Sequence, residues 1–176
     1  EILFIEVSTM PGKGGVQITG QLGDVMKESA QAAYTYVRSH YKDFDLKPDF
    51  YKTIDLHIHV PEGAVPKDGP SAGVTMTTAI VSALTGKAVK KNIGMTGEVT
   101  LQGRVLPIGG LKQKVLAAHA AGLTDVFLPY RNKADLDEVP EEVREEMTFH
   151  PVMSVEEVID LALEPAGSTA DVASMS

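Results

Sequence analysis

The chain has 176 residues, of which 43% are hydrophobic and none is cysteine. This length can bury one full core, and the lack of cysteine excludes a disulfide framework or a thiolate metal site. Sixteen basic residues against 24 acidic ones give a formal net charge of −8, which opposes binding to nucleic acid. The longest apolar stretch, residues 72–84, is too short and too polar to span a bilayer.

The N-terminal half alternates strand and helix patterns. Residues 2–8 and 16–20 flank the turn MPGKGG, which predicts a β-hairpin. Apolar residues at three-to-four spacing predict an amphipathic helix over 24–41. Residues 51–60 alternate apolar and polar side chains, which is typical of a strand with one buried face. A helix is expected over 71–84.

The C-terminal half continues this mixed order. Residues 93–109 have β-branched runs around Gly103 and predict a second hairpin. Further strands are expected at 125–129 and 148–152, with helices at 110–122, after Pro140 and at 154–163. We therefore expect an α+β fold, with one compact domain of mixed sheet and packed helices over 1–164. Residues 165–176 are small and polar and predict a disordered tail.

Two stretches offer sites of other kinds. MPGKGG is glycine-rich and contains a lysine, but a phosphate loop requires a serine or threonine after the lysine and a following helix. Lys13 is followed by glycine and a strand, so a plain hairpin turn is favoured. Asp55, His57 and His59 would share one strand face and could ligate a metal if further ligands joined them. Solvated polar residues on a half-buried strand are the commoner outcome.

The motif PKDGPSAG, residues 66–73, places Ser71 at the start of a helix. Pro70 suits the first turn of that helix, so Ser71 should lie in the turn among unpaired backbone N–H groups. Those groups and the helix dipole would stabilise an oxyanion formed when the hydroxyl attacks a carbonyl. The alternative is that Ser71 only caps the helix.

A nucleophilic serine requires a base, and the helix over 110–122 offers one. At 100° per residue, Lys114 falls on the apolar face with Leu111 and Val115, whereas Lys112 falls to one side. Burial would lower the pKa of Lys114 and make it a usable base near neutral pH. The alternative is a lysine whose ammonium extends from the edge of the apolar stripe into water.

The motifs PKDGPSAG, MTGEVTLQGRVLPIGGLKQK and VFLP, with the acidic helix and HPV after them, resemble the proteolytic domain of the Lon family of ATP-dependent proteases. The resemblance extends from the first strand to about Glu164. It implies an α+β fold and a serine peptidase with a Ser-Lys dyad, in which Ser71 is the nucleophile and Lys114 its base. It also implies that Thr96 helps to hold the lysine and that Asp68 belongs to the loop shaping the serine's surroundings. Gln113 stands where glutamate is frequent in the family.

The same resemblance implies partners and context. The domain would act on unfolded polypeptides, within a homo-oligomer that is a hexameric ring, with no membrane or nucleic-acid partner. It would need no cofactor, because ATP and magnesium are used by an ATPase module that precedes this domain in the family. These 176 residues contain no Walker motif, so we expect them neither to bind ATP nor to unfold substrates. The chain opens on Glu1 directly into a strand, so we expect a piece of a longer protein. A bacterial cytoplasm is expected, ahead of a mitochondrial matrix.

Two functions of other classes stay open. A small-molecule kinase could hold phosphate with the loop at 66–73, although GPSAG supplies few consecutive donors and no carboxylate for magnesium. A non-catalytic assembly or RNA-binding module is the other alternative, and the acidic charge balance opposes RNA.

Overall fold

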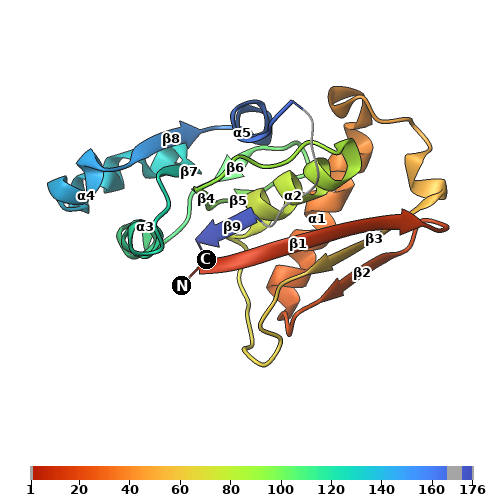
Figure 1. The fold of residues 1–176 in the computed structure, drawn as a ribbon, viewed down its shortest axis with the longest axis horizontal. Helices are drawn as coiled ribbons and strands as arrows, with labels where there is room; N and C mark the ends of the chain where they lie inside the picture. The colour runs from red at the N-terminus through yellow and green to blue at the C-terminus, as the bar shows by residue number, and fades with distance from the viewer. Residues whose placement is uncertain (1, 166–171, 176) are drawn as a thin grey trace.

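The computed structural model describes residues 2–165 and 172–175 (Figure 1). Its main feature is a seven-stranded mixed sheet with the strand order β2-β3-β1-β9-β4-β7-β8, and a separate two-stranded sheet pairs β5 with β6. Helices pack against these sheets, so the predicted α+β class is confirmed. Among the described residues, no helix is both long and apolar enough to cross a membrane.

The elements follow one another in mixed order along the chain. The strands are β1 (Ile2–Pro11), β2 (Val16–Thr19), β3 (Ile54–His59), β4 (Ile93–Met95), β5 (Glu98–Val99), β6 (Val105–Leu106), β7 (Asp125–Pro129), β8 (Thr148–Val152) and β9 (Val172–Met175). The helices are α1 (Asp24–Ser39), α2 (Gly73–Thr85), α3 (Leu111–Ala120), α4 (Glu141–Glu145) and α5 (Val155–Ala162), with the 3-10 helices η1 (Tyr41–Phe44), η2 (Phe50–Lys52) and η3 (Tyr130–Glu138). The sequence patterns predicted all five α-helices, and η3 was not predicted.

The first predicted hairpin is wrong, because β1 and β2 do not pair with each other. Strand β3 lies between them, antiparallel to β1 with Val7 opposite Ile58, and parallel to β2 with Val16 opposite Leu56. Leu56 and Ile58 are buried, as the alternating pattern predicted. A strand with one strongly apolar face buries more of that face in the middle of a sheet than at its edge. Strand β3 therefore lies between β1 and β2 and replaces the predicted pairing of those two strands.

The glycine-rich turn wraps around a carboxylate of its own chain. Asp55 accepts hydrogen bonds from the backbone N–H groups of Lys13, Gly14 and Gly15 at 2.8–2.9 Å. These bonds lower the pKa of Asp55 below its ordinary value. A Cβ at Gly12 would overlap the same carboxylate. Because Asp55 uses the donors that a phosphate would need, the turn is structural.

The second predicted hairpin is confirmed in part. Strands β5 and β6 pair antiparallel, with Val99 opposite Val105, and Gly103 takes the turn with a φ of +82°. Strand β4 belongs to the large sheet instead, where it runs parallel to β7. The chain leaves the large sheet after Thr96, where the N–H of Gly97 bonds to the carbonyl of Ser71 instead.

The predicted disordered tail over 165–176 is wrong for Val172–Met175. These residues form β9, which pairs antiparallel with Ile2–Ile5 and parallel with β4. The side chains of Ser174 and Met175 are fully buried. Residues 166–171 and 176 lie outside the described residues.

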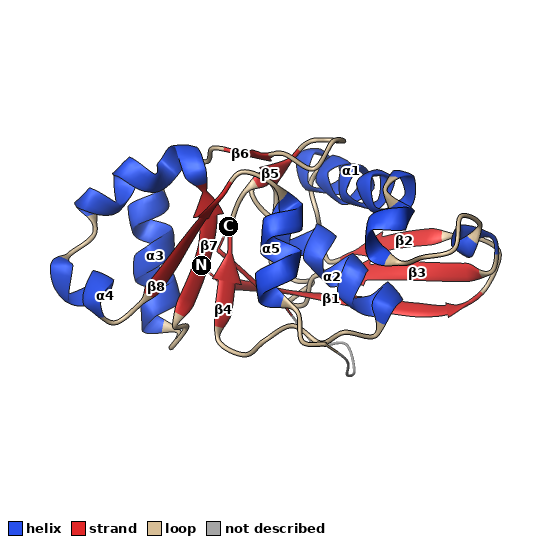
Figure 2. Cartoon of the chain, turned by 90° about the horizontal axis from the view of Figure 1, so that it is seen from above, coloured by secondary structure: helices blue, strands red, loops and turns tan. Residues whose placement is uncertain are grey.

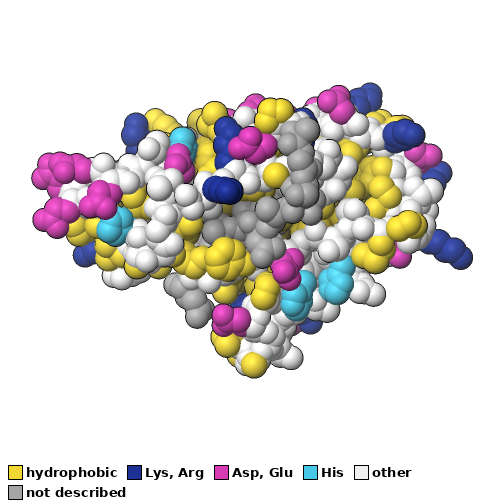
Figure 3. Space-filling model, viewed as in Figure 1, with side chains coloured by type: hydrophobic (Ala, Val, Ile, Leu, Met, Phe, Trp, Pro, Cys, Tyr) yellow, Lys and Arg dark blue, Asp and Glu magenta, His cyan; other side chains and the backbone are white. Residues whose placement is uncertain are grey.

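The core is centred on α2, whose residues Val74, Met76 and Ile80 have no exposed surface. This helix packs against α1, α5 and β1. Figure 2 shows α1 and α2 beside β1, β2 and β3 at one end of the molecule, and α3 and α4 beside β7 and β8 at the other. Acidic side chains gather at the end formed by α4, and on the face shown in Figure 3 lysine and arginine side chains are scattered.

Candidate active site

Ser71 lies in a tight turn immediately before α2. The helix begins at Gly73 with Ala72 as its N-cap, and the N–H of Gly73 donates to the carbonyl of Pro70 at 3.2 Å. The prediction that Ser71 lies within the first helical turn is therefore wrong by two residues. No side chain caps α2. The alternative that Ser71 serves only as a helix cap is therefore wrong, because the N-cap is Ala72 and no side chain caps the helix.

The turn is fixed against Gly97 by main-chain hydrogen bonds on both sides. The N–H of Gly97 donates to the carbonyl of Ser71 at 2.8 Å, and the N–H of Val74 donates to the carbonyl of Gly97 at 3.0 Å. Gly97 has a φ of +157°, and a Cβ there would lie 2.6 Å from Val105 and 2.9 Å from Val74. No larger residue fits this close approach without movement of its neighbours.

Two consecutive side chains hold the segment that leads to Ser71. Lys67 is only 7% exposed, and its ammonium donates to the carbonyls of Gly20 at 2.9 Å and Glu62 at 2.6 Å. The Asp68 carboxylate accepts from the N–H groups of Met26 and Gly69, both at 2.8 Å. Asp68 thus caps the start of α1 from another part of the chain, and these backbone bonds lower its pKa below the ordinary value.

Lys114 projects from the first part of α3 toward the end of β4. Its Nζ donates a long hydrogen bond of 3.4 Å to Thr96 Oγ1. Thr96 is 1% exposed, and its own N–H donates to the carbonyl of Phe127 at 3.0 Å, which continues the pairing of β4 with β7. The Lys114 side chain is half-buried, and this desolvation lowers its pKa below 10.5, as the helical phase predicted.

The structure therefore connects both Ser71 and Lys114 to the dipeptide Thr96–Gly97. Thr96 contacts the lysine, and the next residue, Gly97, binds the backbone of Ser71. Asp68 is in the loop before Ser71, as expected, but its carboxylate is bound at the start of α1. Its contribution to this geometry is to anchor the loop.

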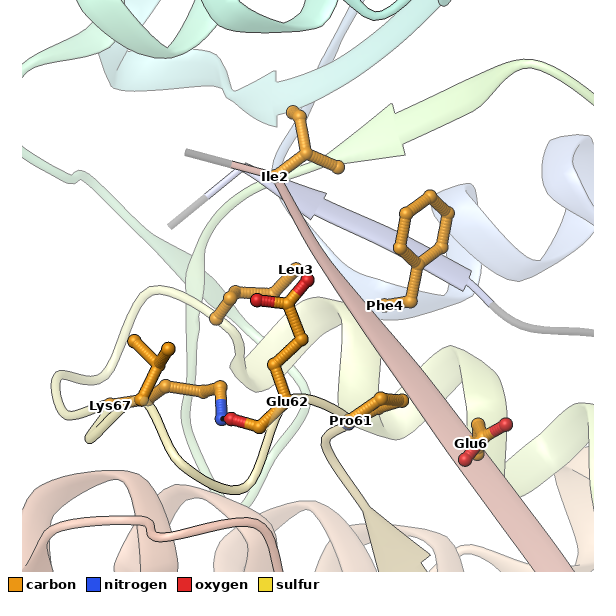
Figure 4. Close-up of a pocket in the computed structure, with 8 residues that line it drawn as sticks. Ile2, Leu3, Phe4, Glu6, Pro61, Glu62 and Lys67 are labelled. Atoms are coloured by element: carbon orange, nitrogen blue, oxygen red, sulfur yellow. Dashed lines mark hydrogen bonds between the residues drawn. The ribbon is translucent and has the colours of Figure 1, made fainter.

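A pocket of about 480 Å³ lies beside this loop (Figure 4). Its walls are mostly apolar side chains from the start of β1 and the segment after β3, with three charged residues among them. The lining consists of Ile2, Leu3, Phe4, Glu6, Pro61, Glu62, Val65 and Lys67. The buried Lys67 thus belongs both to the loop's anchor and to the pocket wall.

His57 and His59 both lie within hydrogen-bonding distance of one threonine hydroxyl. Thr19 Oγ1 lies 2.8 Å from His57 Nε2 and 2.6 Å from His59 Nδ1. Within residues 2–165 and 172–175, no three histidine, aspartate, glutamate or cysteine side chains converge in a way that could hold a metal ion. The third polar residue of that strand face, Asp55, is occupied by the glycine-rich turn.

Sequence reasoning missed Lys67 and Gly97. Lys67 lies within the motif PKDGPSAG, but a lysine in a loop is usually solvated, and no pattern in the sequence indicates burial. Gly97 follows Thr96 directly, and an isolated glycine between two β-branched runs is a signal of close backbone approach that could have identified it.

Comparison with known proteins decides the family. Residues 1–165 match the family described as the Lon protease (S16) C-terminal proteolytic domain. The chain belongs to this family. It is 59% identical over 169 residues to a Lon protease of Brevibacillus choshinensis, covering 95% of this chain and 22% of that protein. It is 61% identical over 163 residues to a Lon protease of Bacillus thuringiensis (strain Al Hakam), covering 93% and 20%.

A third relative, Lon protease 1 of Bacillus subtilis (strain 168), is 60% identical over 163 residues, which cover 93% of this chain and 21% of that protein. The chain thus spans about a fifth of the length of these relatives. It is a Lon-type proteolytic domain, and these matches support a peptidase. They do not favour a kinase or a non-catalytic module.

Proposed function

We propose that this Lon proteolytic domain is a serine endopeptidase in which Ser71 is the nucleophile and Lys114 is the general base. One observation carries the proposal: Lys114, with a pKa lowered by burial, donates to Thr96, and the adjacent Gly97 binds the backbone of Ser71. A lowered pKa raises the fraction of the amine that is neutral, and the neutral amine is the form that can accept a proton.

The reaction would proceed through an acyl-enzyme. Neutral Lys114 takes the proton from the Ser71 hydroxyl, and the Oγ attacks the peptide carbonyl carbon. The resulting ammonium then protonates the departing amine, and the neutral amine next activates water to hydrolyse the ester. Neither a metal ion nor a cofactor takes part in these proposed reaction steps.

The oxyanion would be stabilised by backbone donors of the turn before α2. In the part of the chain that the structure describes, the N–H groups of Ser71 and Ala72 have no acceptor, whereas those of Gly73 and Val74 are paired. Unpaired N–H groups next to the nucleophile, at the positive end of a helix, are suited to a developing negative charge.

The proposed substrates are unfolded polypeptides bound in extended form. An extended segment can pair with a strand edge through its main chain, which gives affinity with little dependence on sequence. The pocket beside the loop could take one side chain of such a segment. The proposal includes a homo-oligomeric ring in a bacterial cytoplasm, with ATP and magnesium used only by a separate ATPase module. The domain alone would then cleave casein-like chains and leave stably folded proteins intact, with or without ATP.

The direct test is labelling by a fluorophosphonate or peptide boronate, followed by mass spectrometry. We expect one covalent adduct, located on Ser71, and parallel loss of peptide hydrolysis. The Ser154→Ala variant is the matched control, because Ser154 caps α5 and its hydroxyl has no proposed part in the reaction. Hydrolysis that persists in fully labelled protein, or an adduct on another serine, would overturn the proposal.

A further inference from the structure

Asn132 is a buried amide in η3 that holds the segment leading into α3. Its Oδ1 accepts from the N–H of Ile108 at 2.9 Å, and its Nδ2 donates to the carbonyl of Ile108 at 2.9 Å. The Nδ2 also donates to Asp135 Oδ2 at 2.8 Å, and the residue is only 3% exposed. The side chain therefore binds both backbone polar groups of one residue, Ile108, as a neighbouring strand would.

Between this point and α3 the chain has little else to fix it. Gly109 and Gly110 carry no side chains, and a Cβ built on either would meet no described atom within 4 Å. Gly110 is the N-cap, with a φ of +70°, and no side chain caps α3. The start of the helix is thus held by the Asn132 clamp on one side and by the burial of Leu111 and Val115 on the other.

Lys114 is close to this start, and its N–H donates to the carbonyl of Gly110 at 3.2 Å. The bond from Lys114 Nζ to Thr96 Oγ1 is already long, at 3.4 Å. Hydrogen bonds weaken steeply beyond this length, so a small displacement of α3 would break the contact. The position of the lysine amine relative to Thr96 therefore depends on how firmly Ile108 is held.

We infer that Asn132 is a positioning residue that fixes the N-terminal turn of α3 and so places Lys114 against Thr96. The inference rests on the proposed Ser71–Lys114 chemistry for its consequence in catalysis, and Asn132 itself does not touch the reacting atoms. Removal of the amide leaves the N–H and carbonyl of Ile108 without their side-chain partner. The segment then shifts to reach water, and the amine of Lys114 moves toward solvent.

The first test measures Lys114 without any need for catalysis. The acetylation rate of the Lys114 amine is followed against pH by mass spectrometry in the 176-residue protein, and its midpoint reports the pKa. We expect a midpoint below 10.5 in the parent and a rise toward the ordinary value in Asn132→Ala. The Ser154→Ala variant is the control, because it loses a helix cap elsewhere and should keep the parent's midpoint. A midpoint in Asn132→Ala equal to the parent's would overturn the inference.

The second test separates positioning from general destabilisation. In Asn132→Ala we expect kcat for peptide hydrolysis to fall by about ten- to a hundredfold with KM nearly unchanged, since a misplaced base affects the chemical step. If Asn132→Ala does not fold, Asn132→Asp decides, because its carboxylate still accepts from Ile108 N–H but has no donor for the carbonyl. Asn132→Asp should lose activity, and parent-like kcat in that variant would contradict the inference. An active Ser71→Ala variant would instead refute the proposed function, whereas the acetylation midpoint would still test the role of Asn132.

Discussion

The N–H of Gly97 donates a 2.8 Å hydrogen bond to the carbonyl of Ser71, and this bond ties the turn before α2 to the end of β4. Thr96, the residue before Gly97, accepts from Lys114. Two segments that are distant in sequence thus meet on one dipeptide. Small displacements of that dipeptide would move the hydroxyl and the amine together, so their relative geometry is kept.

Ser71→Ala should abolish peptide hydrolysis and leave the fold intact. The hydroxyl caps no helix, so its removal should change the free energy of unfolding little. Ser154→Ala provides the opposite case, since Ser154 accepts from the N–H of Glu157 in a capping box and its loss should cost about 0.5–2 kcal/mol. Activity and urea denaturation are measured for both variants. Ser71→Ala activity within a few-fold of the parent would be incompatible with a serine nucleophile at this position.

Lys114 and Lys112 should respond differently to substitution. Lys114→Ala and Lys114→Arg should lose activity by about 10²–10⁴-fold, the arginine because its guanidinium stays protonated and cannot accept a proton. Lys112→Ala should retain most activity, since Lys112 is two residues away and points to another side of α3. The parent's kcat/KM should rise with pH, with an apparent pKa below 10.5. An inactive Lys112→Ala with an active Lys114→Ala would reverse the assignment.

Thr96→Val should lower kcat without unfolding the domain, because valine keeps the shape of the buried side chain and removes the acceptor for Lys114. A hydrogen bond of about 0.5–1.5 kcal/mol corresponds to a loss of about two- to tenfold. Thr78→Val is the matched control, since Thr78 is equally buried but donates only to the carbonyl of Val74 within α2. Equal kinetics in the two variants would show that the contact with Lys114 has no part in the rate.

The parts of the fold that could be predicted are those set by local pattern. The alternation in β3 and the helical phase of Lys114 depend only on residue spacing, and both agree with the structure. The position of β3 between β1 and β2 could not be predicted. It depends on whether pairing with the distant β3 is more stable than a local hairpin of β1 and β2, and residue spacing does not show this. Strand β9 was missed because it is only four residues long and lies in a stretch of mostly small and polar residues.

The candidate site also combines features that local sequence patterns predict with features that only long-range contacts determine. Ser71 and Lys114 are candidates from motif and helical phase alone, but the main-chain bonds that fix the turn before α2 to Gly97 are indicated by no pattern near Ser71. Asn132 is a further case. A polar residue after the strand β7 would ordinarily be solvated, and its burial follows from the distant backbone of Ile108.

Asp68→Ala should lower the melting temperature at neutral pH. The backbone N–H bonds from Met26 and Gly69 lower the folded-state pKa of Asp68 below its ordinary value of 3.8. Its stabilisation is therefore present above about pH 4 and is lost as the pH falls through the folded-state pKa. The difference in melting temperature between parent and variant should shrink below pH 4. A difference that does not change down to pH 2 would argue against this capping role.

Lys114→Met should make the domain more stable at neutral pH, although it removes the proposed base. Burial lowers the folded-state pKa of Lys114 below 10.5, so the unfolded chain binds more protons between the two values, and stability rises with pH across that window. The cost of burying the amine is fully present below the folded-state pKa and disappears above 10.5. Methionine has no such cost and fills a similar volume.

The gain in melting temperature for Lys114→Met should therefore be largest near pH 7 and shrink as the pH approaches 10.5. Lys112→Met serves as the control for a change of one charge on the same helix, and it should give no comparable gain. Calorimetry of the three proteins between pH 7 and 10.5 measures the effect. A variant less stable than the parent at pH 7 would mean that the lysine is held by favourable contacts stronger than its desolvation, and a base poised by burial would then be untenable.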